Sequence, residues 1–427
     1  RRREVTGPPS EAIAALPPHR DPNPGQDINL TLDLDLQRIA HGALSMKLAG
    51  AVVALEADTG RVLAMVSGPG IDPNRYEQPI PAAQWQQWSE SPLKPFIDKT
   101  VQEHFFPGST YKVVSALAAL SDPEFDPDAS MECTGSVVFG GRRFKDTHVH
   151  GRVDLEQAIV QSCNSYFYDL AIKSTLSLER VEPIARDLGL GERSGLGLNG
   201  EVKGTIPTEE FEAREGTYQG GVRLNSAIGQ GNVKVTVMQL AVVYAALANG
   251  GTVLTPYLVD RIETNEGKLV LRTEPQPRNE RQVLDPADRE RIHRGLVGVV
   301  NDEHGTAYSE RLANVVVAGK TGTAQVGREI GKADLDLPGW DTSQDHAWFA
   351  SYAPADDPKI VVVAVVEHGG TGADAAAPIV MKVIEHYLGN TTSETGTKPR
   401  GPGMPPPLPG HKGDAAVPAD THAGARP

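Results

Sequence analysis

The central part of the sequence has strand patterns near both of its ends and mostly helical patterns between them. Two pairs of β-rich runs are each separated by a short turn, which predicts two antiparallel hairpins. They are residues 51–56 with 61–67 and residues 346–353 with 359–366. Strands that are far apart in the chain but flank helical sequence favour an α+β fold with a central antiparallel sheet covered by helices.

The remaining periodicity fills in this fold. Two more β-rich runs lie at 314–318 and 322–326. Apolar residues at helical spacing predict helices near 34–48, 109–121, 154–161, 165–173, 235–249, 285–300 and 375–388.

Composition sets the outer boundaries of the folded unit, which we expect at about 27–389. Residues 1–26 are rich in proline and charge, which predicts a linker or the remnant of a preceding domain. Residues 390–427 are rich in proline, glycine and threonine, which predicts a disordered tail.

Charge and hydropathy exclude several classes of function. The chain has 41 Lys and Arg against 55 Asp and Glu, a net charge of −14, which argues against nucleic-acid binding. The longest apolar run, Leu240 to Ala248, is far shorter than the roughly 20 residues that span a bilayer. The sequence opens on Arg1 without a signal-peptide pattern, so we expect any targeting or anchoring segment to lie upstream.

The first motif that carries chemistry is Ser109-x-x-Lys112. Pro107 and Gly108 end an extended segment, and apolar residues then recur at helical spacing, so Ser109 is predicted at a helix N-terminus with Lys112 on the same face. A buried lysine loses its proton more easily and can act as a general base, and free N–H groups of the helix can stabilise an oxyanion. The alternative is a helix-capping serine beside a surface lysine.

Two more motifs follow along the chain. Ser162-Cys163-Asn164 lies between two predicted helices, where a tight turn presents Ser162 and Asn164 to one side; the alternative is an ordinary connecting turn. Lys320-Thr321-Gly322-Thr323 follows a β-rich run, and Gly322 keeps the strand surface open for a ligand; the alternative is an edge strand with a solubilising lysine. All three motifs in this order are not expected by chance, so we interpret them together as one site.

This motif set resembles that of penicillin-binding proteins and serine β-lactamases. Longer stretches resemble the transpeptidase domain of class B penicillin-binding proteins, namely PGSTYK (107–112), AIGQG (227–231), GLVGVVNDEHGTA (295–307), AGKTGTAQ (318–325) and WFASYAP (348–354). Within that class the penicillin-binding protein 2 group is most similar, through LTLDLDLQ (30–37), KDTHVHGRVDL (145–155) and VVEHGGTGADAAAPI (365–379). Asp98-Lys99 departs from the Asn-Arg pair that is more common in relatives.

The resemblance implies the penicillin-binding transpeptidase fold, with an all-helical subdomain beside the sheet. It also implies the reaction, in which Ser109 attacks the penultimate D-Ala carbonyl of a peptidoglycan stem peptide, with Lys112 as the base. Ser162 relays a proton to the leaving amine, Lys320 polarises this relay, and Asn164 orients Lys112.

Other roles implied by the resemblance concern binding of the substrate. The N–H groups of Ser109 and Thr323 form the oxyanion hole, and the hydroxyls of Thr321 and Thr323, next to Gly322, bind the terminal carboxylate. A second stem peptide resolves the acyl-enzyme, and β-lactams acylate the same serine.

The implied setting is the periplasmic side of the bacterial inner membrane, with an N-terminal anchor and a membrane glycosyltransferase of the elongation machinery as partner. A serine β-lactamase is the nearest rival, but no motif supplies a base for a deacylating water. A D,D-carboxypeptidase would use the same residues, and a β-lactam sensor or inactive scaffold is the non-enzymatic alternative.

Catalysis requires no cofactor, but Cys133, Asp146, His150 and Cys163 form a plausible tetrahedral zinc set. Some relatives in the penicillin-binding protein 2 group have a similar zinc site before the SxN motif. Such a zinc would be structural, because four protein ligands leave no open position. The alternatives are a Cys133–Cys163 disulfide or two free thiols, and His148 in place of His150.

Overall fold

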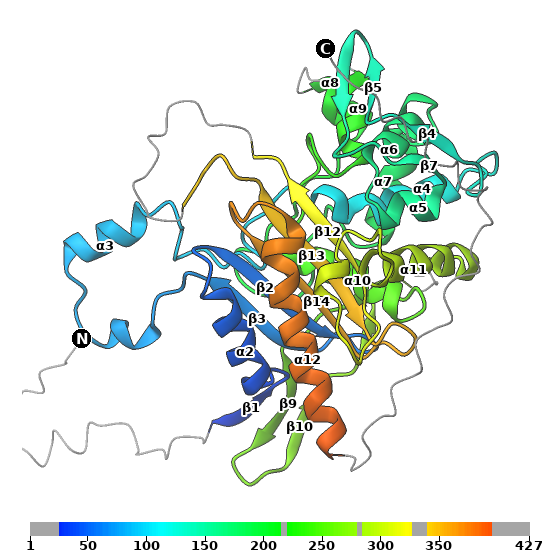
Figure 1. Cartoon of the computed structure of the whole chain (residues 1–427). Coiled ribbons are helices and arrows are strands. Elements are labelled where there is room, and N and C mark those ends of the chain that lie inside the picture. Colours follow the sequence, from blue (N-terminus) through cyan, green and yellow to red (C-terminus); the bar gives the residue numbers. More distant parts are fainter. Residues whose placement is uncertain (1–24, 215–219, 280–283, 327–339, 395–427) are drawn as a thin grey trace, which may run out of the picture.

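A computed structural model describes residues 25–214, 220–279, 284–326 and 340–394. Residues 395–427 of the tail predicted over 390–427, and residues 1–24 of the linker predicted over 1–26, lie outside the described residues. Figure 1 shows a central sheet with helices on both faces and a second, mostly helical region at one end. The predicted α+β class, with its antiparallel sheet covered by helices, is confirmed.

The central sheet has five antiparallel strands in the order β12-β13-β14-β2-β3. The strands are β2 (Gly50–Glu56), β3 (Val62–Gly68), β12 (Ala318–Ala324), β13 (His346–Ala353) and β14 (Ile360–Val366). Strand β14 has the sequence IVVVAVV and is buried throughout, as expected for a β-branched run covered on both faces. Both predicted hairpins, β2–β3 and β13–β14, are confirmed.

Helices cover the two faces of this sheet. Helix α10 (Val237–Ala248) is buried at every residue and packs on β14, β2 and β13. Helices α2 (Leu34–Leu44) and α12 (Ala377–Glu394) pack on each other and on the sheet, and lie together in front of it in Figure 1. Helix α12 follows a π-helical turn, η4 (Gly372–Ala376), and continues past the tail boundary predicted at 390.

The second region holds most of the remaining helices. They are η2 (Gly108–Tyr111), α4 (Lys112–Leu120), α5 (Leu155–Val160), α6 (Asn164–Ile172), α7 (Leu178–Asp187), α8 (Glu209–Arg214), α9 (Gly220–Ala227), α11 (Pro286–Asn301) and η3 (Tyr308–Glu310). Helix α11 joins this region to the central sheet, because it packs on α5, α4 and β12.

The expectation of an all-helical subdomain needs correction, because four short strands lie in this region. They form two antiparallel pairs, β4 (Met131–Cys133) with β7 (Gly151–Val153) and β5 (Ser136–Phe139) with β6 (Arg142–Lys145). The turn at Gly140-Gly141 joins β5 to β6, and both glycines have positive φ. The hairpins bring residues 133 and 146–150 toward the start of α6.

Sheets outside the centre complete the fold. Strand β1 (Gln26–Leu30) pairs with β9 (Val259–Thr264), which also pairs with β10 (Leu269–Arg272), and β8 (Leu254–Thr255) pairs with β11 (Gln276–Pro277). One prediction was wrong: residues 314–317 are not a strand, and 322–326 are not a separate one. A single strand, β12, spans 318–324, since Gly319 and Gly322 lie within its pairing with β13.

Candidate active site

The predicted nucleophile lies in a tight turn at the start of α4. Ser109 is in the 3-10 turn η2, and Lys112 is the first residue of α4. The Thr110 hydroxyl closes this turn by donating to the Pro107 carbonyl at 2.7 Å. The sequence predicted an α-helix from residue 109; the first turn is tighter, and the α-helix begins three residues later.

Strand β12 passes close against this turn. Gly108 has φ +55°, and a Cβ there would lie 2.7 Å from the Thr323 carbonyl oxygen. A Cβ on Gly322 would lie 2.9 Å from the Pro107 carbonyl oxygen. The two glycines therefore allow the backbones of the SxxK and KTG motifs to meet, with Ser109 and Thr323 on either side of the contact.

Lys112 is completely buried and is held by the second motif. Its Nζ donates to the Ser162 carbonyl at 2.7 Å, to the Asn164 Oδ1 at 2.7 Å and to the Ser162 Oγ at 3.4 Å. Burial lowers the pKa of Lys112 to about 8, against the opposing effect of the Asp146 carboxylate. About a tenth of the amine is therefore neutral at pH 7, far more than for an exposed lysine, and the neutral form is the one that a general base requires.

The turn that holds Lys112 has an unusual backbone. Ser162 has φ +59°, in the left-handed region that residues with a side chain rarely adopt. Asn164 then begins α6. Asp146 fixes this start, since its two carboxylate oxygens accept the backbone N–H groups of Asn164 at 3.0 Å and Ser165 at 2.6 Å. Burial would raise the pKa of Asp146, but these hydrogen bonds outweigh it and lower the pKa to about 2.

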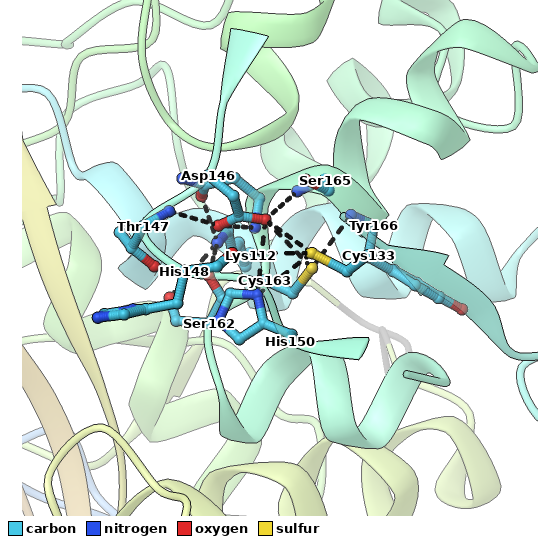
Figure 2. Close-up of polar contacts among 11 residues, drawn as sticks. Lys112, Cys133, Asp146, Thr147, His148, His150, Ser162, Cys163, Ser165 and Tyr166 are labelled. Atoms are coloured by element: carbon cyan, nitrogen blue, oxygen red, sulfur yellow. Dashed lines mark hydrogen bonds and ion pairs between the residues drawn. The ribbon is translucent and has the colours of Figure 1, made fainter. Parts of the chain in front are cut away.

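The four predicted metal ligands lie together directly behind this turn (Figure 2). Asp146 Oδ2 is 3.5 Å from Cys133 Sγ, 3.3 Å from Cys163 Sγ and 3.7 Å from His150 Nδ1. Cys133 Sγ is 3.4 Å from His150 Nδ1. All four ligand atoms lie within 4.8 Å of one another, and we call these residues the Cys₂AspHis cluster.

The structure bears on two of the alternatives that the sequence left open here, the disulfide and His148. Both cysteines are buried and free, so the disulfide is not formed. His148 contributes its backbone carbonyl, 4.0 Å from Cys133 Sγ, while its ring points away from the cluster and His150 points into it (Figure 2).

The third motif lies on β12, at the edge of the central sheet. Lys320, Thr321 and Gly322 pair with Ala350, Phe349 and Trp348 of β13. Lys320 is buried, and burial together with the nearby Lys112 lowers its pKa well below the usual value. Lys320 Nζ donates to the Thr321 carbonyl at 3.3 Å, and Lys112 Nζ lies 3.4 Å from the Ser162 hydroxyl. The buried Lys112 therefore has one serine hydroxyl within reach for moving a proton, while its charge disfavours the charged form of Lys320.

Sequence reasoning gave no role to Thr306 or Gln230, although both lie in stretches that it singled out. The Thr306 hydroxyl is 2.6 Å from the Thr321 hydroxyl. The Gln230 amide donates to the Thr323 carbonyl at 3.3 Å. The signals were the HGTA and AIGQG segments, but nothing in their local pattern shows that they contact β12.

The fold and the three motifs place this chain in a class of acyl-transfer proteins that have a serine in an SxxK motif. Residues 50–385 match the family model described as penicillin binding protein transpeptidase domain. The chain belongs to this family.

Within this family, the chain is similar to proteins with more specific names. The chain is 34% identical over 376 residues to "Peptidoglycan D,D-transpeptidase MrdA" of Haemophilus influenzae, an alignment that covers 85% of this chain and 56% of that protein. The chain therefore spans little more than half the length of this curated relative.

Solved structures of penicillin-binding proteins are also similar to this chain. Pseudomonas aeruginosa PBP2 in complex with WCK 5153 matches with a TM-score of 0.75 and 33% identity, over 87% of this chain and 78% of that one. Penicillin-binding protein A from M. tuberculosis, as a ceftriaxone acyl-enzyme complex, matches with a TM-score of 0.73 and 27% identity, over 86% and 81%. The resemblance to the penicillin-binding protein 2 group is thus confirmed, as is the transpeptidase fold.

Within the described residues, every helix is too short or too polar to cross a membrane.

Proposed function

We propose that this chain is the catalytic domain of a peptidoglycan D,D-transpeptidase that cross-links stem peptides in cell elongation and is a target of β-lactams. The observation that carries the proposal is the meeting of three motifs: buried Lys112 contacts Ser162 and Asn164, while β12 lies against the Ser109 turn. The family match and the relatives named D,D-transpeptidases support it over a β-lactamase or sensor.

Acylation follows from these positions. The Ser109 Oγ attacks the carbonyl carbon of the penultimate D-Ala, and neutral Lys112 accepts the hydroxyl proton. The N–H groups of Ser109 and Thr323 stabilise the tetrahedral oxyanion. When the C–N bond breaks, Ser162 delivers a proton to the departing D-Ala amine, with Lys320 polarising its hydroxyl. The Lys112 contacts with Ser162 Oγ and Asn164 support this relay.

Binding and turnover use the remaining residues. The hydroxyls of Thr321 and Thr323, beside Gly322 and Lys320, bind the terminal carboxylate of the donor peptide. The amine of a second stem peptide then attacks the acyl carbon, which releases Ser109 and forms the cross-link. β-Lactams acylate Ser109 in the same way but leave a slowly resolved ester.

The deciding experiment is intact-protein mass spectrometry over time after addition of a penicillin. Wild type is expected to gain one long-lived adduct, and Ser109→Ala none. An adduct that vanishes within seconds while hydrolysed drug accumulates would instead identify a β-lactamase. Absence of any adduct on folded wild type would contradict the proposal.

We also propose that the Cys₂AspHis cluster binds a structural zinc ion. Tetrahedral zinc with Zn–N and Zn–O bonds of about 2.0 Å and Zn–S bonds of about 2.3 Å requires ligand atoms about 3.3–3.8 Å apart. Four of the six separations between these ligand atoms, at 3.3–3.7 Å, fit this requirement, and all six are within 4.8 Å. A bound zinc would fix the SxN turn through Cys163 and Asp146 and take no part in the reaction.

Two histidine variants test this site in the same loop. His150→Ala is expected to lose the metal, whereas His148→Ala, whose ring points away, keeps about one zinc per chain. Metal analysis of the purified variants and melting curves with chelator provide the measurement. Wild type with far less than one zinc, or equal loss in both variants, would exclude the site.

For the setting of the enzyme, we propose the periplasmic side of the bacterial inner membrane, with a membrane glycosyltransferase of the elongation machinery as partner. The support is the similarity to penicillin-binding protein 2 relatives, which act in cell-wall synthesis. Co-purification of the longer protein with that glycosyltransferase from membranes tests the partnership. Recovery of the longer protein alone would contradict it.

A further inference from the structure

A segment outside the motifs, residues 69–98, forms an arm that leaves the end of β3 and returns just before the nucleophile turn. It carries a 3-10 turn, η1 (Pro73–Glu77), and helix α3 (Ala82–Ser89). Figure 1 shows α3 standing away from the central sheet and from the helices around it. Neither η1 nor α3 has a buried residue. Core packing therefore does not explain the sequence of α3.

The two ends of the arm are held together by Lys99, which is completely buried. Its Nζ donates to the Gly68 carbonyl at 2.9 Å and the Leu93 carbonyl at 2.8 Å, and forms an ion pair with Glu367 at 2.7 Å. The Ser67 hydroxyl accepts from the Lys99 N–H and donates to the Ile97 carbonyl. The arm is thus fixed at its base to β3 and to the end of β14.

The tip of the arm presents aromatic rings to solvent. Trp85 and Trp88 on α3 are two of the four tryptophans of the chain. The Phe96 ring lies 5.0 Å from Trp85 and 6.2 Å from Trp88, in tilted and edge-on geometry. Trp85 is 49% exposed, Phe96 is also exposed, and Trp88 is half-buried. The three rings therefore order one another by their contacts while part of their surface remains accessible.

The polar residues around these rings are mainly neutral amides. Residues 69–97 contain three acidic and two basic side chains, and one of the basic ones, Lys94, is paired with Glu103. Gln84 donates to Gln87, and Gln86 donates to Glu90, which holds these amides in fixed orientations. An anionic membrane or a nucleic acid calls for clustered cations, which are scarce here. Exposed aromatic faces beside oriented amides suit a neutral, hydroxyl-rich and acetamide-bearing ligand.

The base of the arm lies near the end of β12. His346 pairs with Ala324, the residue after Thr323 on β12. Lys99 is paired with Glu367, which follows Val366, and Val366 pairs with Ala347 next to His346. Phe105, just beyond the arm, packs edge-on against the His346 ring at 5.5 Å. The arm therefore extends outward from the end of the KTG strand.

We propose that this arm binds the glycan strand of peptidoglycan, with the faces of Trp85 and Trp88 stacked on sugar rings and the Gln84 and Gln87 amides bonded to acetamido and hydroxyl groups. The inference rests on the proposed function, because it names the polymer that carries the stem peptides. Contact with the glycan would hold a polymeric substrate beside the proposed active site while Ser109 reacts with its peptide.

The test compares the Trp85→Ala/Trp88→Ala double variant with wild type. The probe is peptide-free glycan strands, obtained by removing stem peptides from purified peptidoglycan with an amidase, and titrated by calorimetry. Binding by wild type and about tenfold weaker binding by the variant are expected. Trp85→Phe/Trp88→Phe keeps aromatic faces and should retain most of the affinity.

A matched control removes two exposed apolar side chains elsewhere. Leu269→Ala/Leu271→Ala lies on β10, and both leucines are about as exposed as Trp85. This variant should bind the glycan as wild type does. Penicillin acylation of Ser109 should be unchanged in every variant, since none of the altered residues belongs to the site.

The outcomes separate the two proposals. Normal acylation with no glycan binding, or with binding that the double variant retains, overturns the glycan site and leaves the transpeptidase intact. Wild type that resists penicillin altogether overturns the proposed function itself. Tryptophan-dependent binding to phosphatidylethanolamine–phosphatidylglycerol vesicles, without glycan binding, would replace the glycan by a membrane.

Discussion

The two walls of the proposed active site are built differently. Strand β12 forms the sheet wall, and its Lys320, Thr321 and Gly322 are held by regular backbone pairing with β13. Residues 162–164 form the turn wall, which has a left-handed residue and no strand partner, and is held by Asp146, Lys112 and the Cys₂AspHis cluster. In the sheet wall, many backbone hydrogen bonds share the work of holding the residues in place. In the turn wall, a few side-chain hydrogen bonds do this alone.

From this difference we expect a single substitution in the turn wall to reduce acylation more than a single substitution in the sheet wall. Asp146→Asn is expected to slow penicillin acylation about 100-fold, because one oxygen can no longer accept a charge-assisted bond and Asn164 shifts away from Lys112. Loss of these bonds should also lower the free energy of unfolding by about 1.5–3 kcal/mol. Acylation rates and denaturant unfolding measure the two effects.

Asp154→Asn is the matched control, because it makes the same chemical change in the same region. Asp154 caps α5 by accepting the Gln157 N–H, and asparagine caps helices equally well. Wild-type acylation by Asp146→Asn would show that the turn wall is held in another way.

The pH dependence of acylation tests the role of Lys112, which contacts the turn wall and lies three residues after Ser109. Burial lowers the pKa of Lys112 to about 8, so below this pH the amine is protonated and cannot accept the Ser109 proton. The acylation rate should rise roughly tenfold per pH unit up to about 8 and level off above it. A rate that is flat between pH 6 and 9, with the protein folded throughout, would exclude Lys112 as the base.

The smallest effect is expected on the sheet wall. Thr306→Val removes the hydroxyl partner of Thr321, but the backbone of Thr321 stays paired with Phe349. We expect a loss of about three- to tenfold in acylation efficiency, mainly through weaker binding of the β-lactam carboxylate. Thr306→Ser should restore it. A loss as large as that of Asp146→Asn would show that the two walls do not differ as described.

The features that could be predicted from the sequence are those that depend on residues close together in the chain. Ser109-x-x-Lys112 lies on one turn because of helix geometry, and both hairpins of the central sheet follow from β-rich runs around short turns. The four ligands of the Cys₂AspHis cluster were also chosen from residue types, and the structure brings them within 4.8 Å.

What the sequence did not predict depends on contacts between distant segments. Strand β1 pairs with β9 across more than 200 residues, and neither run has a clear period that indicates its partner. The contact of Thr306 with Thr321 arises only because α11 packs on β12. Helix α3 was missed because the apolar periodicity used to find helices comes from burial, and α3 buries no residue.

The Lys99 contacts have a consequence for how this chain can vary. Because both ends of the arm meet at one buried side chain, the chain between them is a closed loop whose length hardly affects the rest of the fold, and closing a loop twice as long costs only about 0.6 kcal/mol. Insertions, deletions or a transplanted segment between Pro69 and Leu93 should therefore leave the nucleophile where it is. The arm is a place where evolution or an engineer can change the exposed surface beside the proposed active site without moving the residues of that site.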